Sequence, residues 1–90
     1  MNQSIWKFPT PIVDEFSLDM PEGAEILDVE RQDVDPCIWA LVNTDAPLKP
    51  RRFAWYGTGH RASGIAKADH IGTVLLHGGR LVFHLFERRP

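Results

Sequence analysis

The apolar residues of this 90-residue chain come in short alternating runs, and proline or glycine separates one run from the next. No segment shows the three-to-four-residue spacing of an amphipathic helix, whereas alternation with this punctuation is typical of strands. We therefore expect an all-β fold, mainly antiparallel, built as a small sandwich or half-closed barrel of about six strands. A short helix near 62–69 is the one alternative to strand and loop. The runs lie at 5–8, 16–20, 25–34, 37–42, 51–56, 70–76 and 80–87.

Two connections predict hairpins. Asp35-Pro36 interrupts the chain between the runs 25–34 and 37–42, and His77-Gly78-Gly79 joins the last two runs. A Gly-Gly pair suits the positive φ angles of a tight turn. In the run 25–34 we expect strict alternation, with Ile26, Asp28, Glu30 and Gln32 on one face and Leu27, Val29, Arg31 and Asp33 on the other.

The composition is that of an ordinary globular protein, with 43% hydrophobic and 24% charged residues, so we expect one domain over residues 1–90. The single Cys37 has no partner for an intramolecular disulfide, which favours a reducing cytoplasm. No run approaches the roughly 20 apolar residues of a membrane span, and the N-terminus lacks the pattern of a signal peptide. We expect a cytoplasmic protein without membrane contact.

The last run is apolar on both faces. Leu81, Phe83 and Leu85 alternate with Val82, His84 and Phe86. A strand of this kind needs cover on both sides, and a 90-residue chain has little core to offer. We expect a homo-oligomer, most simply a dimer, with an interface that includes part of Arg80 to Glu87.

The two halves of the chain differ in charge. Residues 1–45 carry a net charge of -8 and residues 46–90 a net charge of +6, for a total of -2. Acidic and basic strands that lie side by side in one sheet would neutralise each other. Alternatively, the basic half binds an anionic ligand or meets the acidic half of another copy.

The basic half contains one candidate site. Gly57-Thr58-Gly59-His60-Arg61 follows a strand with Arg51 and Arg52 at its start and Trp55 and Tyr56 at its end. The two glycines allow backbone N–H groups to cradle an anion, guanidinium groups hold phosphate, and indole and phenol rings stack on a base. A tight turn, edge arginines and core aromatic residues are the competing interpretation. The candidate ligand-binding residues are Arg51, Arg52, Trp55, Tyr56, Gly57, Thr58, Gly59, His60 and Arg61.

No pattern predicts catalysis, a metal or a cofactor. The histidines at 60, 70, 77 and 84 lack the spacing of zinc ligands, and no serine lies in a nucleophile elbow. Cys37 opens an apolar run, which suits an inert buried thiol. Paired carboxylates lie in acidic turns and indicate solvated surface. We expect a protein that is not an enzyme; the alternative is an enzyme that uses His60 or His70 as a general base on a phosphorylated substrate.

Several motifs along nearly the whole chain resemble one family. They are Ile5-Trp6-Lys7-Phe8-Pro9, Met20-Pro21-Glu22-Gly23-Ala24, Trp39-Ala40-Leu41-Val42, Gly57-Thr58-Gly59-His60, Ile71-Gly72-Thr73 and Leu81-Val82-Phe83-His84-Leu85-Phe86-Glu87. The chain resembles a group of small uncharacterised bacteriophage and prophage proteins, with Phe8 where tyrosine is more usual. The resemblance implies a phage-derived accessory protein in the host bacterial cytoplasm and brings no catalytic residues.

Two functions follow as expectations. In the first, a phage-type anti-defence protein binds and sequesters a small anionic ligand such as a nucleotide signal. In the second, an inhibitor or adapter binds a host defence protein through its acidic N-terminal half, around Asp14 to Asp35. Long duplex nucleic acid is not an expected partner, because the net acidity would repel the phosphate backbone.

Overall fold

The computed structural model describes residues 2–33 and 35–90. The expected all-β sandwich is confirmed, and it has seven strands rather than about six. The strands are β1 (Gln3–Pro9), β2 (Glu15–Pro21), β3 (Glu25–Gln32), β4 (Asp35–Asn43), β5 (Leu48–Gly57), β6 (Ala68–Leu76) and β7 (Leu81–Arg88). A single 3-10 turn, η1 (Ile65–Lys67), is the short helix expected near 62–69. Val34 of the third run lies outside the described residues.

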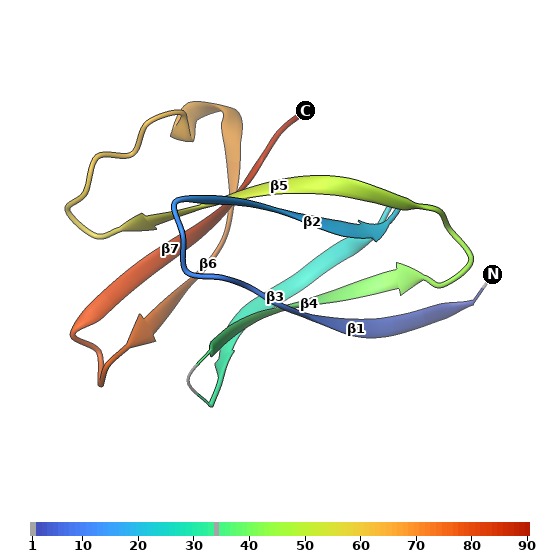
Figure 1. Cartoon of the computed structure of the whole chain (residues 1–90), viewed down its shortest axis with the longest axis horizontal. Coiled ribbons are helices and arrows are strands. Elements are labelled where there is room, and N and C mark those ends of the chain that lie inside the picture. The colour runs from blue at the N-terminus through green and yellow to red at the C-terminus, as the bar shows by residue number, and fades with distance from the viewer. Residues whose placement is uncertain (1, 34) are drawn as a thin grey trace.

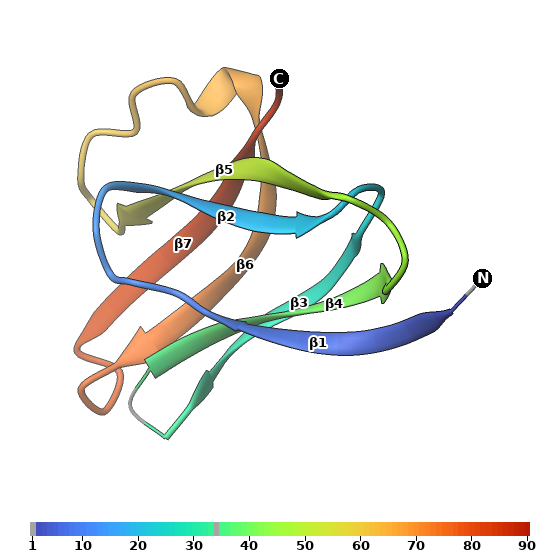
Figure 2. The same ribbon diagram turned by 45° about the vertical axis from the view of Figure 1, so that its right-hand side comes forward.

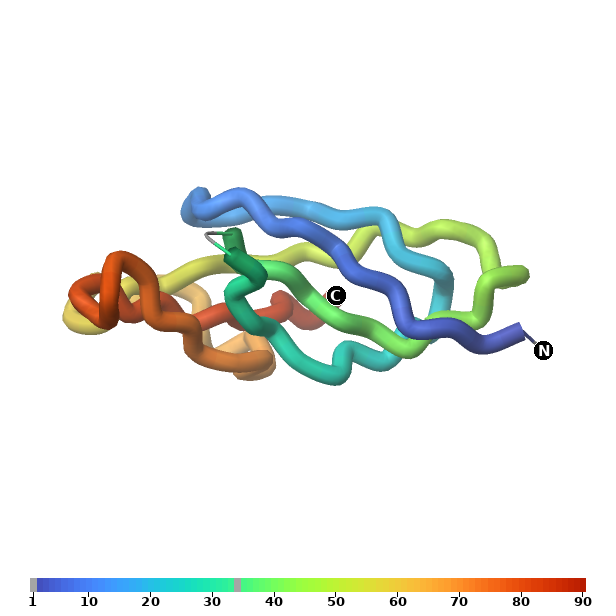
Figure 3. The backbone as a smooth tube through the Cα atoms, turned by 90° about the horizontal axis from the view of Figure 1, so that it is seen from below, coloured from blue at the N-terminus to red at the C-terminus, as the bar shows by residue number. Residues whose placement is uncertain are grey.

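Two antiparallel sheets form the layers of the sandwich (Figure 1). One is three-stranded in the order β1-β4-β3, and the other is four-stranded in the order β2-β5-β7-β6. The molecule is flat, with extents of 42 × 29 × 16 Å (Figure 3). β1 and β2 are the edge strands on one side of the sandwich. On the other side the edge strands β3 and β6 contact each other, so the two sheets approach each other there.

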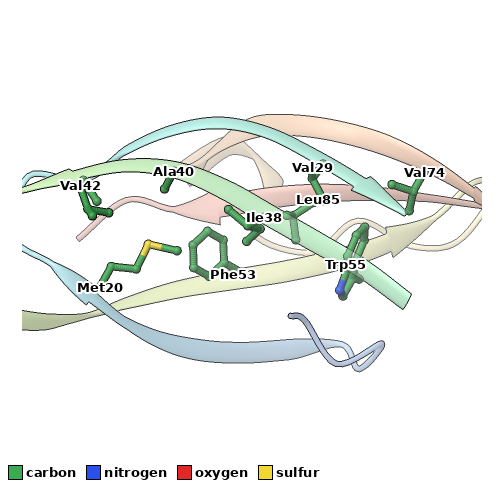
Figure 4. Close-up of a cluster of buried hydrophobic side chains, with 10 residues drawn as sticks. Met20, Val29, Ile38, Ala40, Val42, Phe53, Trp55, Val74 and Leu85 are labelled. Atoms are coloured by element: carbon green, nitrogen blue, oxygen red, sulfur yellow. The ribbon is translucent and has the colours of Figure 1, made fainter. Parts of the chain in front are cut away.

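The core lies between the sheets and is built from alternate residues of nearly every strand (Figure 4). Phe53, Met20, Ile38 and Leu85 are completely or almost completely buried. Phe16 and Leu18 pack against this cluster on the same face of β2 as Met20, as the alternation predicts. Burial of such large apolar side chains contributes about 1.5–3 kcal/mol each, which makes this layer the main source of stability.

Both expected hairpins are confirmed: β3 pairs with β4, and β6 pairs with β7. In the β6–β7 turn, His77 and Gly78 have φ angles of 51° and 66°, the positive pair that a type I′ turn requires. The amide of Gly79 donates to the carbonyl of Leu76 at 3.1 Å and closes that turn.

The expected strict alternation of the third run is wrong. The register between β3 and β4 shifts between Ile26 and Asp28, which marks a bulge at Leu27. The extra residue lets both Ile26 and Val29 face the core, opposite Ala40 and Ile38. Glu25, Asp28 and Glu30 consequently lie on the outer face of the three-stranded sheet.

Ion pairs within the chain neutralise part of the charge asymmetry. Arg88 pairs with Glu15, and Lys49 pairs with Glu22, so two ion pairs join the basic half to the acidic half. Among the described residues, 2–33 and 35–90, no ion pair includes Glu25, Asp28 or Glu30. The three-stranded sheet therefore keeps an acidic outer face.

β7 lies between β5 and β6, so its backbone edges are both used within the chain. Leu85 and Phe83 face the core, whereas Val82, His84 and Phe86 are half-buried on the outer face of the four-stranded sheet. Neighbouring side chains already cover part of this second apolar face, including Tyr56 against Phe86 and His70 against Phe86. The homo-oligomer expected from this strand stays a prediction. Within the described residues, no helix has the length and apolar character of a membrane span.

Candidate functional site

The candidate residues of the basic half fall at two separate places along β5 (Figure 1). Arg51 and Arg52 lie beside the end of β7, near the turn between β2 and β3. Trp55, Tyr56 and the loop 57–61 lie at the carboxyl end of β5. The structure brings the loop residues together with the two aromatic residues, and it does not bring the arginines to them.

The loop after β5 is a hydrogen-bonded turn. The amide of Thr58 donates to the carbonyl of Val82 at 3.0 Å, and the amide of His60 donates to the carbonyl of Gly57 at 3.0 Å. Gly59 has a φ of 83°, a left-handed conformation that favours glycine. Two amides of the expected anion cradle are thus already occupied, and the competing interpretation as a tight turn describes this backbone.

A small hollow of about 220 Å³ lies beside this turn. His60 and Arg61 line it together with Trp55, Phe83 and Asp14. Trp55 is only 5% exposed, and its Nε1 donates to the carbonyl of Pro11 at 2.9 Å, so its ring is a core element rather than a free stacking surface. The negative charge of Asp14 would repel an anion in this hollow.

Tyr56 is also used within the chain. Its hydroxyl donates to the carbonyl of Ser63 at 2.6 Å and lies 3.4 Å from Nη2 of Arg88. The ring packs edge-on against Phe86 with centroids 5.5 Å apart. Tyr56 therefore ties the loop after β5 to the outer face of β7 and presents little free surface for stacking.

A larger hollow of about 470 Å³ lies where β7 ends beside β5. Its lining residues include four arginines and one acid, Glu87. We call it the arginine hollow; its lining residues are Gly23, Ala24, Pro50, Arg51, Arg52, Glu87, Arg88, Arg89 and Pro90. The excess of positive charge makes it the most cationic of the hollows formed by residues 2–33 and 35–90.

Arg51 is the lining residue of the arginine hollow with the most hydrogen bonds to its side chain. Its Nε and Nη2 donate to the two carboxylate oxygens of Glu87 at 2.6 and 2.7 Å, and its Nη1 donates to the carbonyl of Ala24. The hydrogen bond to Glu87 raises the pKa of Arg51 above its ordinary value, against the opposing effect of burial. A bidentate pair of this kind orients the guanidinium group and holds it charged.

The other arginines differ in how far they are engaged. Arg88 pairs with Glu15, and its Nε is a buried donor with no partner in the part of the chain that the structure describes. Arg89 pairs with Asp69 at 3.2 Å in an exposed contact, and its Nη2 donates to the carbonyls of Ala66 and Ala68 at 3.4 and 3.3 Å. Arg52 is exposed and takes part in none of the side-chain bonds of the described residues. Arg52 is therefore the arginine of this hollow most accessible to a ligand.

Sequence reasoning missed Glu87, Arg88 and Arg89 as site residues. They are 35 or more residues away from Arg51 and Arg52 in the chain. The antiparallel register that sets Phe53 opposite Glu87 brings them together. The terminal sequence Glu87-Arg88-Arg89, an acid followed by two bases, is the only local signal. It indicates a site with Arg51 and Arg52 only when the pairing of β5 with β7 is known.

Two threonine hydroxyls contact the ring of His84. The hydroxyl of Thr58 lies 2.7 Å from Nε2 of His84, and that of Thr73 lies 2.9 Å from Nδ1, so both ring nitrogens of His84 are hydrogen-bonded. The side chain of His84 is half-buried on the outer face of β7. Within residues 2–33 and 35–90, no three His, Cys, Asp or Glu side chains are grouped to hold a metal ion.

The family described as a domain of unknown function, DUF7352, matches the chain over residues 1–90, so the chain belongs to that family. No curated protein and no solved structure matches it.

Proposed function

We propose that this member of the DUF7352 family is a non-enzymatic binding protein that captures a small anionic ligand, such as a nucleotide, in the arginine hollow. The observation that carries the proposal is a hollow of about 470 Å³ whose lining residues include four arginines and one acid, Glu87. Pockets for small molecules range over about 300–1,000 Å³, so the volume suits a ligand of nucleotide size.

The arginines have different roles in this proposal. Arg51 stays paired with Glu87, because its Nε and Nη2 already donate to the two carboxylate oxygens at 2.6 and 2.7 Å. Arg52 supplies the main contact to the anion, since it is exposed and makes no side-chain bond within the described residues. Arg89 adds positive charge nearby while it stays bonded to Asp69, Ala66 and Ala68. Planar, multidentate guanidinium donors match the oxygens of a phosphate.

The wider role, that of a phage-type accessory protein which sequesters a nucleotide signal, depends on the resemblance of the motifs and on this hollow together. A sequestering protein needs a binding site and no catalytic group.

A thermal-shift screen tests the proposal. The panel contains inorganic phosphate, pyrophosphate, mononucleotides and cyclic dinucleotides. A ligand at 100 times its dissociation constant should add about 2.7 kcal/mol of stability. We expect Arg52→Ala to weaken binding by roughly 10–100-fold, since a charged hydrogen bond contributes about 1.5–3 kcal/mol.

Arg61→Ala is the matched control, because Arg61 is an exposed arginine that lines the hollow beside the loop and not the arginine hollow. It should bind as the wild type does. Loss of binding in Arg61→Ala alone would move the site to the loop 57–61. A panel without any shift would overturn the anion-binding proposal.

A second candidate function is the binding of a basic protein partner, and a separate observation favours it. Glu25, Asp28 and Glu30 lie on the outer face of the three-stranded sheet. The half-buried side chains of Trp39 and Leu41 lie on the same face. An apolar centre with an acidic surround is typical of a protein interface. Replacing the three acids with Gln or Asn should abolish capture of such a partner and leave ligand-induced thermal shifts unchanged.

A further inference from the structure

β1 has a free backbone edge. It is the outermost strand of its sheet, paired with β4 alone (Figure 2). At its two ends, the carbonyl of Asn2 accepts from Thr44, and the amide of Thr10 donates to Pro36. Because successive residues of a strand direct their polar groups to opposite sides, the even-numbered residues bond to β4. The N–H and C=O groups of Gln3, Ile5 and Lys7 therefore point to the free edge.

The side chains of β1 are unusually apolar for an edge strand. Ile5 is 61% exposed and Trp6 is 36% exposed, and Ile12 and Val13 in the following connection are also exposed. Ile5 lies opposite Leu41 on the outer face of the sheet. Native proteins protect such edges with charge, proline or a covering partner, because an apolar free edge is a template for further pairing.

The charge on this edge does not block pairing. Lys7 is the only charged residue of β1, and its Nζ donates to Oε1 of Gln32 at 2.7 Å. This bond draws the ammonium group back over its own sheet toward β3. Pro9 lacks an N–H at the far end of the edge, so the pairing groups are confined to Gln3, Ile5 and Lys7.

The other free edge on this side of the sandwich is protected. β2 is paired with β5 alone. The amide of Trp55 donates to the carbonyl of Asp14, and the amide of Glu22 donates to Pro47, so the even-numbered residues bond to β5. Glu15 and Asp19 consequently belong to the free edge of β2. A ladder between two copies of β2 would gather four carboxylates, which repel each other.

We propose that two copies of the chain join through β1, in antiparallel register about Ile5, to form one continuous six-stranded sheet. Ile5 then lies opposite Ile5 of the second copy, and Gln3 lies opposite Lys7. This register pairs the free N–H and C=O groups of all three residues in each copy, leaves Pro9 outside the ladder and opposes no like charges. It covers the exposed side chain of Ile5, which the single chain leaves in water. The interface is isologous, as a two-fold dimer requires.

Sedimentation velocity over a concentration series tests the dimer. We expect a monomer–dimer equilibrium for the wild type and a monomer at every concentration for Ile5→Lys, because the register sets two ammonium groups opposite each other. The side chain of Ile5 is exposed in the single chain, so the variant should keep the circular dichroism spectrum and the melting behaviour of a folded monomer.

Two controls separate this interface from others. Leu48→Lys alters a leucine that is 60% exposed at the start of β5, and Leu75→Lys alters an exposed leucine on the outer face of the four-stranded sheet. Both should dimerise as the wild type does. A wild type that stays monomeric throughout the series would overturn the proposal. Dissociation by Leu75→Lys with a dimeric Ile5→Lys would also overturn it, in favour of an interface on the β7 face.

Discussion

A Cβ atom added at Gly72 would lie 2.6 Å from Cγ1 of Val29, closer than side-chain carbons approach one another. The register of β6 against β7 shifts between His70 and Gly72, so the glycine follows a bulge that bends β6 toward β3. Val29 is 1% exposed and has no room to withdraw. The absence of a side chain at position 72 lets the two sheets close on this side.

Gly72→Ala should therefore destabilise the fold by about 1–3 kcal/mol, the usual cost of overpacking a core. Urea denaturation measures the change. In a Val29→Ala background the added methyl group has space, so the double variant should lose less than the sum of the two single losses. Strict additivity would show that the contact between β3 and β6 is looser than described.

Glu87→Gln should cost about 1.5–3 kcal/mol, because it leaves the partly buried guanidinium group of Arg51 without its carboxylate. Asp69→Asn is the matched control. Its ion pair with Arg89 is more than half exposed on both sides, so its loss should change the free energy of unfolding by less than about 1 kcal/mol. Equal losses in the two variants would contradict the special role of the Arg51–Glu87 pair.

The raised pKa of Arg51 sets the sign of its pH dependence. A group whose pKa is higher in the folded than in the unfolded state contributes its full stabilisation below the unfolded pKa. That contribution is lost only as the pH rises through the folded value, which for an arginine lies in strong alkali. The difference in stability between the wild type and Arg51→Gln should thus be constant from neutral to moderately alkaline pH. Denaturation curves at several pH values in that range measure this difference. A decline in the difference would contradict the pairing of Arg51 with Glu87.

The thiol of Cys37 should react slowly with a thiol reagent in the native protein and rapidly in denaturant, because Cys37 is buried with 4% of its surface exposed. The measurement is the rate of colour development with an aromatic disulfide. Fast native reaction would mean that the start of β4 opens more readily than its packing implies.

In the loop after β5, Gly59→Val should lower stability by about 1–3 kcal/mol, since valine strains a backbone with a φ of 83°. Space is not the reason, as a Cβ atom at this position meets nothing within 4 Å. Arg61→Ala, at an exposed position of the same turn, should stay within about 0.5 kcal/mol of the wild type. Thermal melts of the two variants compare strain with side-chain loss directly.

The strands and hairpins were predictable because each depends on local signals. Alternation in Phe16, Leu18 and Met20 orients β2, and the glycines after His77 permit the last turn. The bulge at Leu27 was not predictable. Ile26 and Val29, three residues apart, both face the core, and this requires a break in the alternation between them. Local periodicity carries no sign of where a strand gains an extra residue.

The candidate site was predictable only in part, and the reason is again non-local. Arg51 and Arg52 signalled a cationic site, but Glu87, Arg88 and Arg89 reach them through the pairing of β5 with β7. The two glycines of the loop suggested free amides, yet the carbonyl of Val82 from the neighbouring strand accepts from Thr58. Neither contact leaves a trace in the spacing of residues along the chain.

The location of anion binding is tested most directly by a titration of the isotopically labelled protein with pyrophosphate or a nucleotide, followed by amide nuclear magnetic resonance. The account predicts that the largest shifts cluster on Gly23, Ala24, Arg51, Arg52 and the residues Glu87 to Arg89, which line one hollow although they are far apart in sequence. Saturable shifts there, absent in Arg52→Ala, would support the arginine hollow as the binding site. Shifts confined to residues 57–61, or no saturable shift with any ligand, would contradict it.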